Sequence, residues 1–167
     1  MVFAKKDEKP SGIGQVLGPS QWIDVIGSSE DKWCPEEGDE VVRLLYRLAQ
    51  AGASSDLYFI TPFVNVAEGL CVAIRNSGVL RGWVDEEWRW LNERVGTVHT
   101  AQGREAEAVI IVLGAPNPSQ TGARNWAGSR PNILNVAVTR AKEVVYVVGN
   151  RKLWREAGVF AELDRHL

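Results

Sequence analysis

Two stretches of the chain each join apolar runs to a polar cluster that contains an arginine, and they constrain the fold most. In residues 95–114, VGTVHTAQGREAEAVIIVLG, two apolar runs flank the polar turn QGRE. In residues 131–150, PNILNVAVTRAKEVVYVVGN, a proline can open a helix that ends near Lys142 and leads into an apolar strand. Strands that are apolar throughout and alternate with helices are typical of a parallel sheet that helices cover on both faces.

The rest of the chain continues this alternation. The expected strands are residues 22–26, 57–60, 95–98, 108–113 and 144–148, and the expected helices are residues 35–50, 65–76, 131–142 and 153–167, the last interrupted at Gly158. Residues 79–93 are ambiguous, with a broken strand pattern followed by a helix around Trp88 and Leu91. Residues 115–130 are rich in Gly, Pro, Asn and Ser and predict a loop. Trp126 in that loop could stack on a nucleic-acid base or cap the core, and capping is the commoner use.

A chain of 167 residues fits one domain, and we expect a flexible leader over residues 1–20 and a single domain over residues 21–167. No apolar run approaches the roughly 20 residues that cross a bilayer, and the first residues do not have the pattern of a signal peptide. Cys34 and Cys71 lie far apart, which favours a reduced, cytoplasmic protein. The cysteines and histidines offer no closely spaced pair of ligands, so no metal site is expected.

The net charge is only −2, but the charges are unevenly distributed. Residues 24–42 carry seven acidic side chains and one lysine, whereas residues 121–155 carry seven basic side chains and one glutamate. A basic segment suits a polyanionic partner such as nucleic acid. The alternative, a solvated surface with no partner, describes most such side chains.

Three motifs in this chain resemble those of superfamily 1 helicases. QGRE at residues 102–105 resembles motif V, NVAVTRAK at residues 135–142 resembles motif VI, and FITPF at residues 59–63 resembles motif IV. They follow the family order, and each lies on the expected element. The pattern is most similar to the subgroup of nonsense-mediated-decay helicases, and it covers about residues 20–155. The resemblance implies the second, C-terminal RecA-like domain of a longer protein: an α/β fold of the P-loop NTPase type, with a three-layer parallel sheet between helices.

The resemblance also implies roles for single residues. Arg140 would be the catalytic arginine finger, which stabilises charge on the terminal phosphate of ATP. Glu105 would accept a hydrogen bond from the ribose, Gly103 would let the backbone approach the nucleotide, and Gln102 would shape the turn. The residues implied to contact nucleic acid are Thr61, Pro62, His99, Thr100 and Arg104.

The chain also lacks parts that ATP hydrolysis needs. It contains no phosphate cradle of the form G-x-x-x-x-G-K-S/T. We therefore expect ATP with Mg²⁺ to be held mainly by an N-terminal RecA-like domain of the same protein, and the isolated chain to be inactive. Asp85-Glu86-Glu87 is interpreted as the start of the Trp88 helix and not as a metal box. The Gln-Arg pair that continues motif IV in the family is replaced by Val66 and Ala67, and Arg75 is too far along the same helix to substitute.

These observations predict one half of the motor of an ATP-dependent helicase or translocase that acts on single-stranded DNA or RNA. The alternative is a degenerate, non-catalytic module that binds nucleic acid or a protein partner, and a third possibility is an independent nucleotide-binding domain. Because ligands of parallel sheets bind beyond the carboxyl ends of the strands, we expect Thr61, the Gln102 turn and Arg140 to converge there.

Overall fold

A computed structural model describes residues 12–97, 105–130 and 132–167. Its centre is one sheet of five strands in the order β1-β5-β4-β2-β3, and every neighbouring pair is parallel. The strands are β1 (Gln21–Asp24), β2 (Leu57–Thr61), β3 (Val95–Thr97), β4 (Ala106–Val112) and β5 (Ala141–Gly149). The predicted parallel sheet is therefore confirmed.

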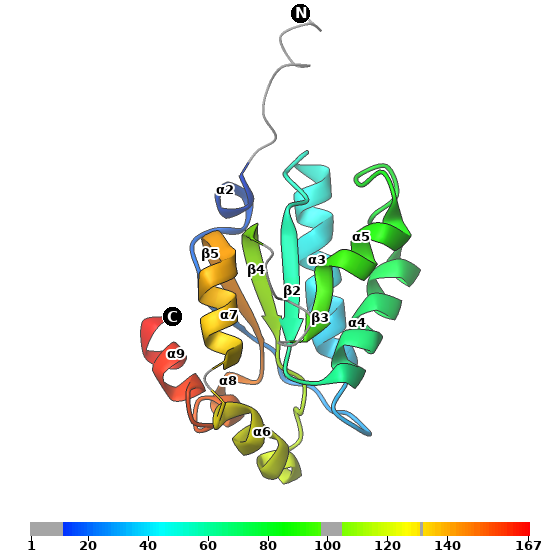
Figure 1. Cartoon of the computed structure of the whole chain (residues 1–167). Coiled ribbons are helices and arrows are strands. Elements are labelled where there is room, and N and C mark those ends of the chain that lie inside the picture. The colour runs from blue at the N-terminus through cyan, green and yellow to red at the C-terminus, as the bar shows by residue number, and fades with distance from the viewer. Residues whose placement is uncertain (1–11, 98–104, 131) are drawn as a thin grey trace, which may run out of the picture.

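Helices surround this sheet. They are α2 (Ile13–Leu17), α3 (Pro35–Gln50), α4 (Val64–Ser77), α5 (Glu87–Arg94), the 3-10 turn η1 (Pro118–Gln120), α6 (Thr121–Gly128), α7 (Asn132–Arg140), α8 (Arg151–Trp154) and α9 (Phe160–His166). In Figure 1, α7 lies in front of the sheet and α3 lies behind it. This arrangement is the predicted α/β fold of the RecA-like type. Among the described residues, no helix combines the length and the apolar character that a bilayer crossing needs.

The central strands are buried on both faces, which explains why they are apolar throughout. All five residues of β2 are buried, and in β4 only Glu107 is partly accessible. A strand of an antiparallel sheet with one wet face would instead alternate polar and apolar residues. The largest fully buried side chains outside the centre, Trp154 and Phe160, pack edge to face with their ring centres 4.7 Å apart.

Two expectations about the ends and loops are wrong. Residues 115–130 are not a plain loop, because they contain η1 and α6. The flexible leader does not extend to residue 20, because α2 lies within it and its Ile13 is fully buried in the core.

The ambiguous stretch, residues 79–93, contains a short bridge between Arg81 and Val84, and α5 follows it. Glu87 begins that helix, as the interpretation of the acidic trio predicted.

Candidate functional site

The start of β4 and the start of β5 bring two predicted ATP-contacting residues together. Arg140 directly precedes the first residue of β5, and Glu105 directly precedes the first residue of β4. Those first residues, Ala106 and Ala141, are partners in the sheet. We refer to this end of the sheet as the amino edge, and to the end where the strands stop as the carboxyl edge. Two side chains that lie 35 positions apart in sequence thus flank one pair of strand residues.

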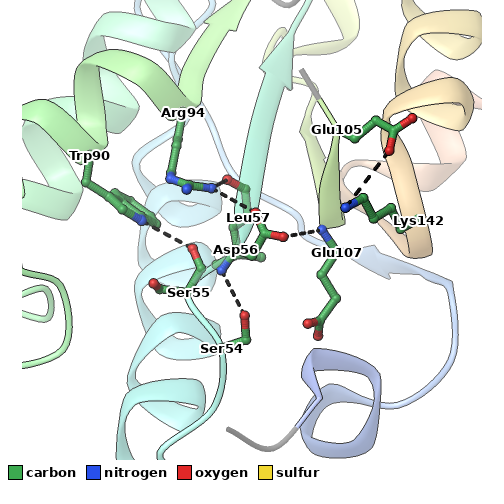
Figure 2. Close-up of polar contacts among 9 residues, drawn as sticks. All are labelled: Ser54, Ser55, Asp56, Leu57, Trp90, Arg94, Glu105, Glu107 and Lys142. Atoms are coloured by element: carbon green, nitrogen blue, oxygen red, sulfur yellow. Dashed lines mark hydrogen bonds and ion pairs between the residues drawn. The ribbon is translucent and has the colours of Figure 1, made fainter. Parts of the chain in front are cut away.

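Two charged groups at this edge face solvent. Glu105 and Lys142 form an ion pair at 4.0 Å, with 61% and 56% of their side chains exposed (Figure 2). An exposed pair of this kind contributes little to stability, so both groups can exchange it for a ligand. Arg140 is half-buried at the end of α7, where the negative pole of a helix favours a cation. The edge therefore presents a carboxylate and cations that can meet hydroxyl and phosphate groups.

Asp56 fixes the geometry of this edge, and sequence reasoning did not identify it. Its carboxylate accepts hydrogen bonds from Arg94 Nη1 and from the backbone N–H of Glu107, both at 3.1 Å (Figure 2). Arg94 Nη1 also donates to the carbonyl of Leu57 at 3.0 Å. One carboxylate thus ties together the starts of β2 and β4 and the end of α5. The only signal in the sequence is an acid directly before a buried strand.

The expectation that Arg140 and Thr61 share one end of the sheet is wrong. Thr61 is the last residue of β2 and lies at the carboxyl edge, opposite Arg140. The reason is topological: a helix that joins two parallel strands starts near the carboxyl edge and must end where the next strand begins. Arg140 ends such a helix.

At the carboxyl edge, the last residues of the FITPF segment, which resembles motif IV, form a tight turn. Thr61 is 1% exposed, and its hydroxyl accepts a hydrogen bond from the Phe63 N–H at 3.3 Å. Pro62 is half-buried and lines a cavity. The structure gives Thr61 a role in shaping the turn, and a contact with nucleic acid stays a prediction. The other predicted residues, His99, Thr100, Gln102, Gly103 and Arg104, lie outside the described residues.

A second residue that the sequence did not single out is Glu37, in the first turn of α3. It is one of the seven acidic side chains of residues 24–42, and it is fully buried. Its Oε1 accepts a hydrogen bond from the Gly114 N–H at 2.9 Å. Burial raises the pKa of this carboxyl to about 8, and burial likewise raises the pKa of the neighbouring Cys34 thiol to about 12. Glu37 therefore joins α3 to the end of β4 as a largely neutral group.

The positions of the missing Gln-Arg pair lie in the first turns of α4. Val66 is fully buried, and Ala67 is half-buried. Arg75 lies in the last turn of the same helix, eight residues or roughly 12 Å further along. That Arg75 does not replace the arginine of the family stays a prediction.

Known proteins resemble the chain over most of its length. The model of a family described as an AAA domain matches residues 14–152. The human 3'-5' exoribonuclease HELZ2 is 27% identical over 184 residues, which cover 98% of this chain and 6% of that protein. The regulator of nonsense transcripts 1 homolog of Neurospora crassa is 29% identical over 120 residues, covering 70% of this chain and 10% of that protein. A regulator of nonsense transcripts from Takifugu rubripes is 33% identical over 118 residues, with the same coverage.

These relatives are therefore much longer than the region they share with the chain. The similarity begins close to α2 and ends in α8, so it covers all five strands of the sheet. Together with the parallel sheet, it establishes that the chain belongs to the AAA domain family of superfamily 1 helicase-like domains.

Proposed function

We propose that this chain is the second motor domain of an ATP-dependent helicase or translocase, and that it completes an ATP site held mainly by another RecA-like domain. The observation that carries the proposal is that Arg140 and Glu105 each precede one of two paired strand residues at the amino edge, where Lys142 adds a second cation. Membership of the helicase-like family supports the same function.

In this proposal the chain contributes a cation that stabilises the transferred phosphoryl group, and the other domain binds most of the triphosphate. ATP supplies the phosphoryl group, and negative charge develops on the oxygens of that group as it is transferred. Arg140 would stabilise this charge with a guanidinium that the end of α7 holds in place. Glu105 would accept a hydrogen bond from the ribose. The phosphate cradle and the acidic ligands of Mg²⁺ would come from the other domain, because this sequence has no such cradle.

The test is ATP turnover by a protein that contains both RecA-like domains, measured with and without single-stranded DNA or RNA. Arg140→Ala is expected to lower turnover by roughly 10³- to 10⁵-fold. Arg140→Lys is expected to restore little of the loss, because an ammonium lacks the planar fork of donors. The matched control is Arg75→Ala, which removes an exposed arginine from the last turn of α4. Normal turnover in Arg140→Ala would remove the proposal.

A second candidate function has one observation in its favour. Ala67 stands where the family carries an arginine, so one of two cationic contacts with the nucleotide is absent. A module that binds nucleic acid without hydrolysing ATP would tolerate this loss. A two-domain protein that binds single strands but shows no turnover, even with Arg140 in place, would favour this candidate.

A further inference from the structure

A cavity of about 590 Å³ opens at the carboxyl edge, beyond the end of β2. Its walls come from the turn after β2, from the first turns of α4 and from α6, which Figure 1 shows beyond the strand ends at the bottom of the view. Two large apolar side chains in these walls are exposed to solvent: Val64 by 64% and Trp126 by 48%. An accessible tryptophan beside a hollow of this size is suited to a flat ligand.

Two aromatic rings form one wall of the cavity. Phe63 is buried, and its ring lies 6.2 Å from that of Trp126 with 25° between the planes. Trp126 therefore packs against the core through Phe63, and about half of the surface of Trp126 stays accessible to solvent. The expectation that Trp126 caps the core describes only one side of this residue. The guanidinium of Arg130 lies over the Trp126 ring, and because this side chain is exposed it can move aside for a base. The accessible surface of Trp126 can then stack on the face of a nucleobase, a contact that does not depend on sequence.

Charged groups of both signs stand around the rings. The ammonium of Lys32 lies 5.4 Å from the centre of the Phe63 ring, and the guanidinium of Arg130 lies 4.5 Å from that of Trp126. Such cations can meet the phosphate of a nucleotide whose base lies against the rings. Asp31, which is 3.6 Å from Lys32, places a carboxylate at the same cavity.

The wall that carries Trp126 is held rigidly. Arg124 is 3% exposed, and its guanidinium donates hydrogen bonds to the carbonyls of Ala115, Asn117 and Pro118 at 2.6–3.2 Å. The side chain of Asn117 in turn donates to the carbonyl of Ser29 at 2.7 Å. Because these contacts tie α6 to the neighbouring loops, a ligand would lose little free energy by ordering this wall.

We propose that this cavity holds one base of a single nucleic-acid strand, stacked against Trp126, and that it favours bases with an exocyclic amino group. This proposal rests on the function proposed above, because it specifies which part of the nucleic-acid strand the domain binds. The preference follows from the carboxylate of Glu68 in the lining, since Lys32 and the Asn65 amide already engage the carboxylate of Asp31. A carboxylate accepts hydrogen bonds from the amino groups of cytosine, adenine or guanine, whereas thymine and uracil offer only one N–H between two carbonyl oxygens.

Binding of ten-nucleotide strands of cytosine and of thymine or uracil, each as DNA and as RNA, tests the proposal on the 167-residue chain. Fluorescence anisotropy gives the affinity, and a strand with a central 2-aminopurine reports stacking through quenching. We expect tighter binding of cytosine strands. Trp126→Ala should weaken binding roughly 5- to 140-fold and abolish the quenching, and Trp126→Phe should keep most of both.

Two further variants separate the possible outcomes. Trp88→Ala removes a tryptophan that is 67% exposed on α5 outside this cavity, and it should change neither signal. Glu68→Gln should bring the affinities for cytosine and thymine strands close together, since an amide can donate as well as accept. If strands bind but Trp126→Ala binds as the unaltered chain does, or if Glu68→Gln leaves the base preference intact, this inference is wrong while the proposed function stands. Failure of the unaltered chain to bind any strand would count against the nucleic-acid role itself.

Discussion

Single buried polar groups hold the carboxyl edge together, and Glu37 gives this edge a dependence on pH. The pKa of its carboxyl is about 8 in the folded chain, against an ordinary value of 4.5. The folded chain therefore binds more protons than the unfolded chain between these values, and stability must fall as pH rises through that window. The cost is at most about 1.4 kcal/mol for each pH unit.

Glu37→Gln is expected to remove this contribution, because an amide keeps an acceptor for the Gly114 N–H and has no proton to lose. Denaturant unfolding between pH 5 and 9 measures the effect. The free energy of unfolding of the unaltered chain, relative to the variant, should decrease steadily up to about pH 8 and then level off. Asp39→Asn, at an exposed acid of the same helix, should leave this slope unchanged. A difference that does not vary with pH would contradict the neutral state inferred for Glu37.

Arg124 is the second polar residue on which the carboxyl edge depends. Arg124→Met keeps the length of the side chain but leaves three carbonyls without their donor. We expect the free energy of unfolding to fall by about 2–4 kcal/mol, because unpaired buried polar groups are costly. The exposed Arg130 is the matched control, and Arg130→Met should lower stability by less than about 1 kcal/mol, because it removes an exposed contact with the Trp126 ring. Thermal and denaturant unfolding give both values, and equal losses would show that burial of Arg124 is not what matters.

Among the helices and strands, α6 is one that the sequence pattern did not predict. Its residues include Gly122, Asn125 and Gly128, which have low helix propensity, and its most buried long side chain is an arginine. Ala123, Trp126 and Ala127 stand at helical spacing, but three apolar residues among glycines are too short a pattern to outweigh the low propensity, and a loop is predicted instead. Tertiary contacts hold it in place, and these join residues far apart in the sequence. The long amphipathic helix α3, in contrast, was predicted with its observed bounds because its own apolar period and Pro35 define it.

The end of α6 meets the turn before α9 so closely that only glycine fits. A Cβ on Gly128 would collide with the backbone carbonyl of Ala157, and the Gly128 carbonyl accepts a hydrogen bond from the Val159 N–H at 3.0 Å. Gly128→Ala is therefore expected to lower the free energy of unfolding by about 1–3 kcal/mol. Gly122→Ala in the same helix meets no atom within 4 Å and should raise it by up to about 1 kcal/mol. Unfolding curves of the two variants test the contact, and a loss of stability in both would point to the helix as a whole.

At the scale of the whole molecule, the parallel topology separates the two proposed sites. The α/β class could be predicted because it depends on local pattern. The relative position of Arg140 and Thr61 depends on the direction in which a connecting helix runs, and reasoning about each motif alone does not supply it. Arg140 and Glu105 occupy the amino edge, and Trp126 stands by the carboxyl edge, with the length of the sheet between them.

This separation predicts that strand binding and the arginine finger are independent in the absence of nucleotide. Arg140→Ala should change the affinity for a ten-nucleotide cytosine strand no more than Arg75→Ala does, because each removes one cation that lies far from the stacked base. Trp126→Ala should show the full loss, and the loss in the Trp126→Ala, Arg140→Ala double variant should equal the sum of the two single free-energy changes within about 0.5 kcal/mol. Anisotropy titrations without ATP measure all four variants at one salt concentration. A loss of affinity for Arg140→Ala as large as that for Trp126→Ala would mean that the strand crosses the amino edge. Nucleotide and nucleic acid would then not bind at opposite ends of the sheet.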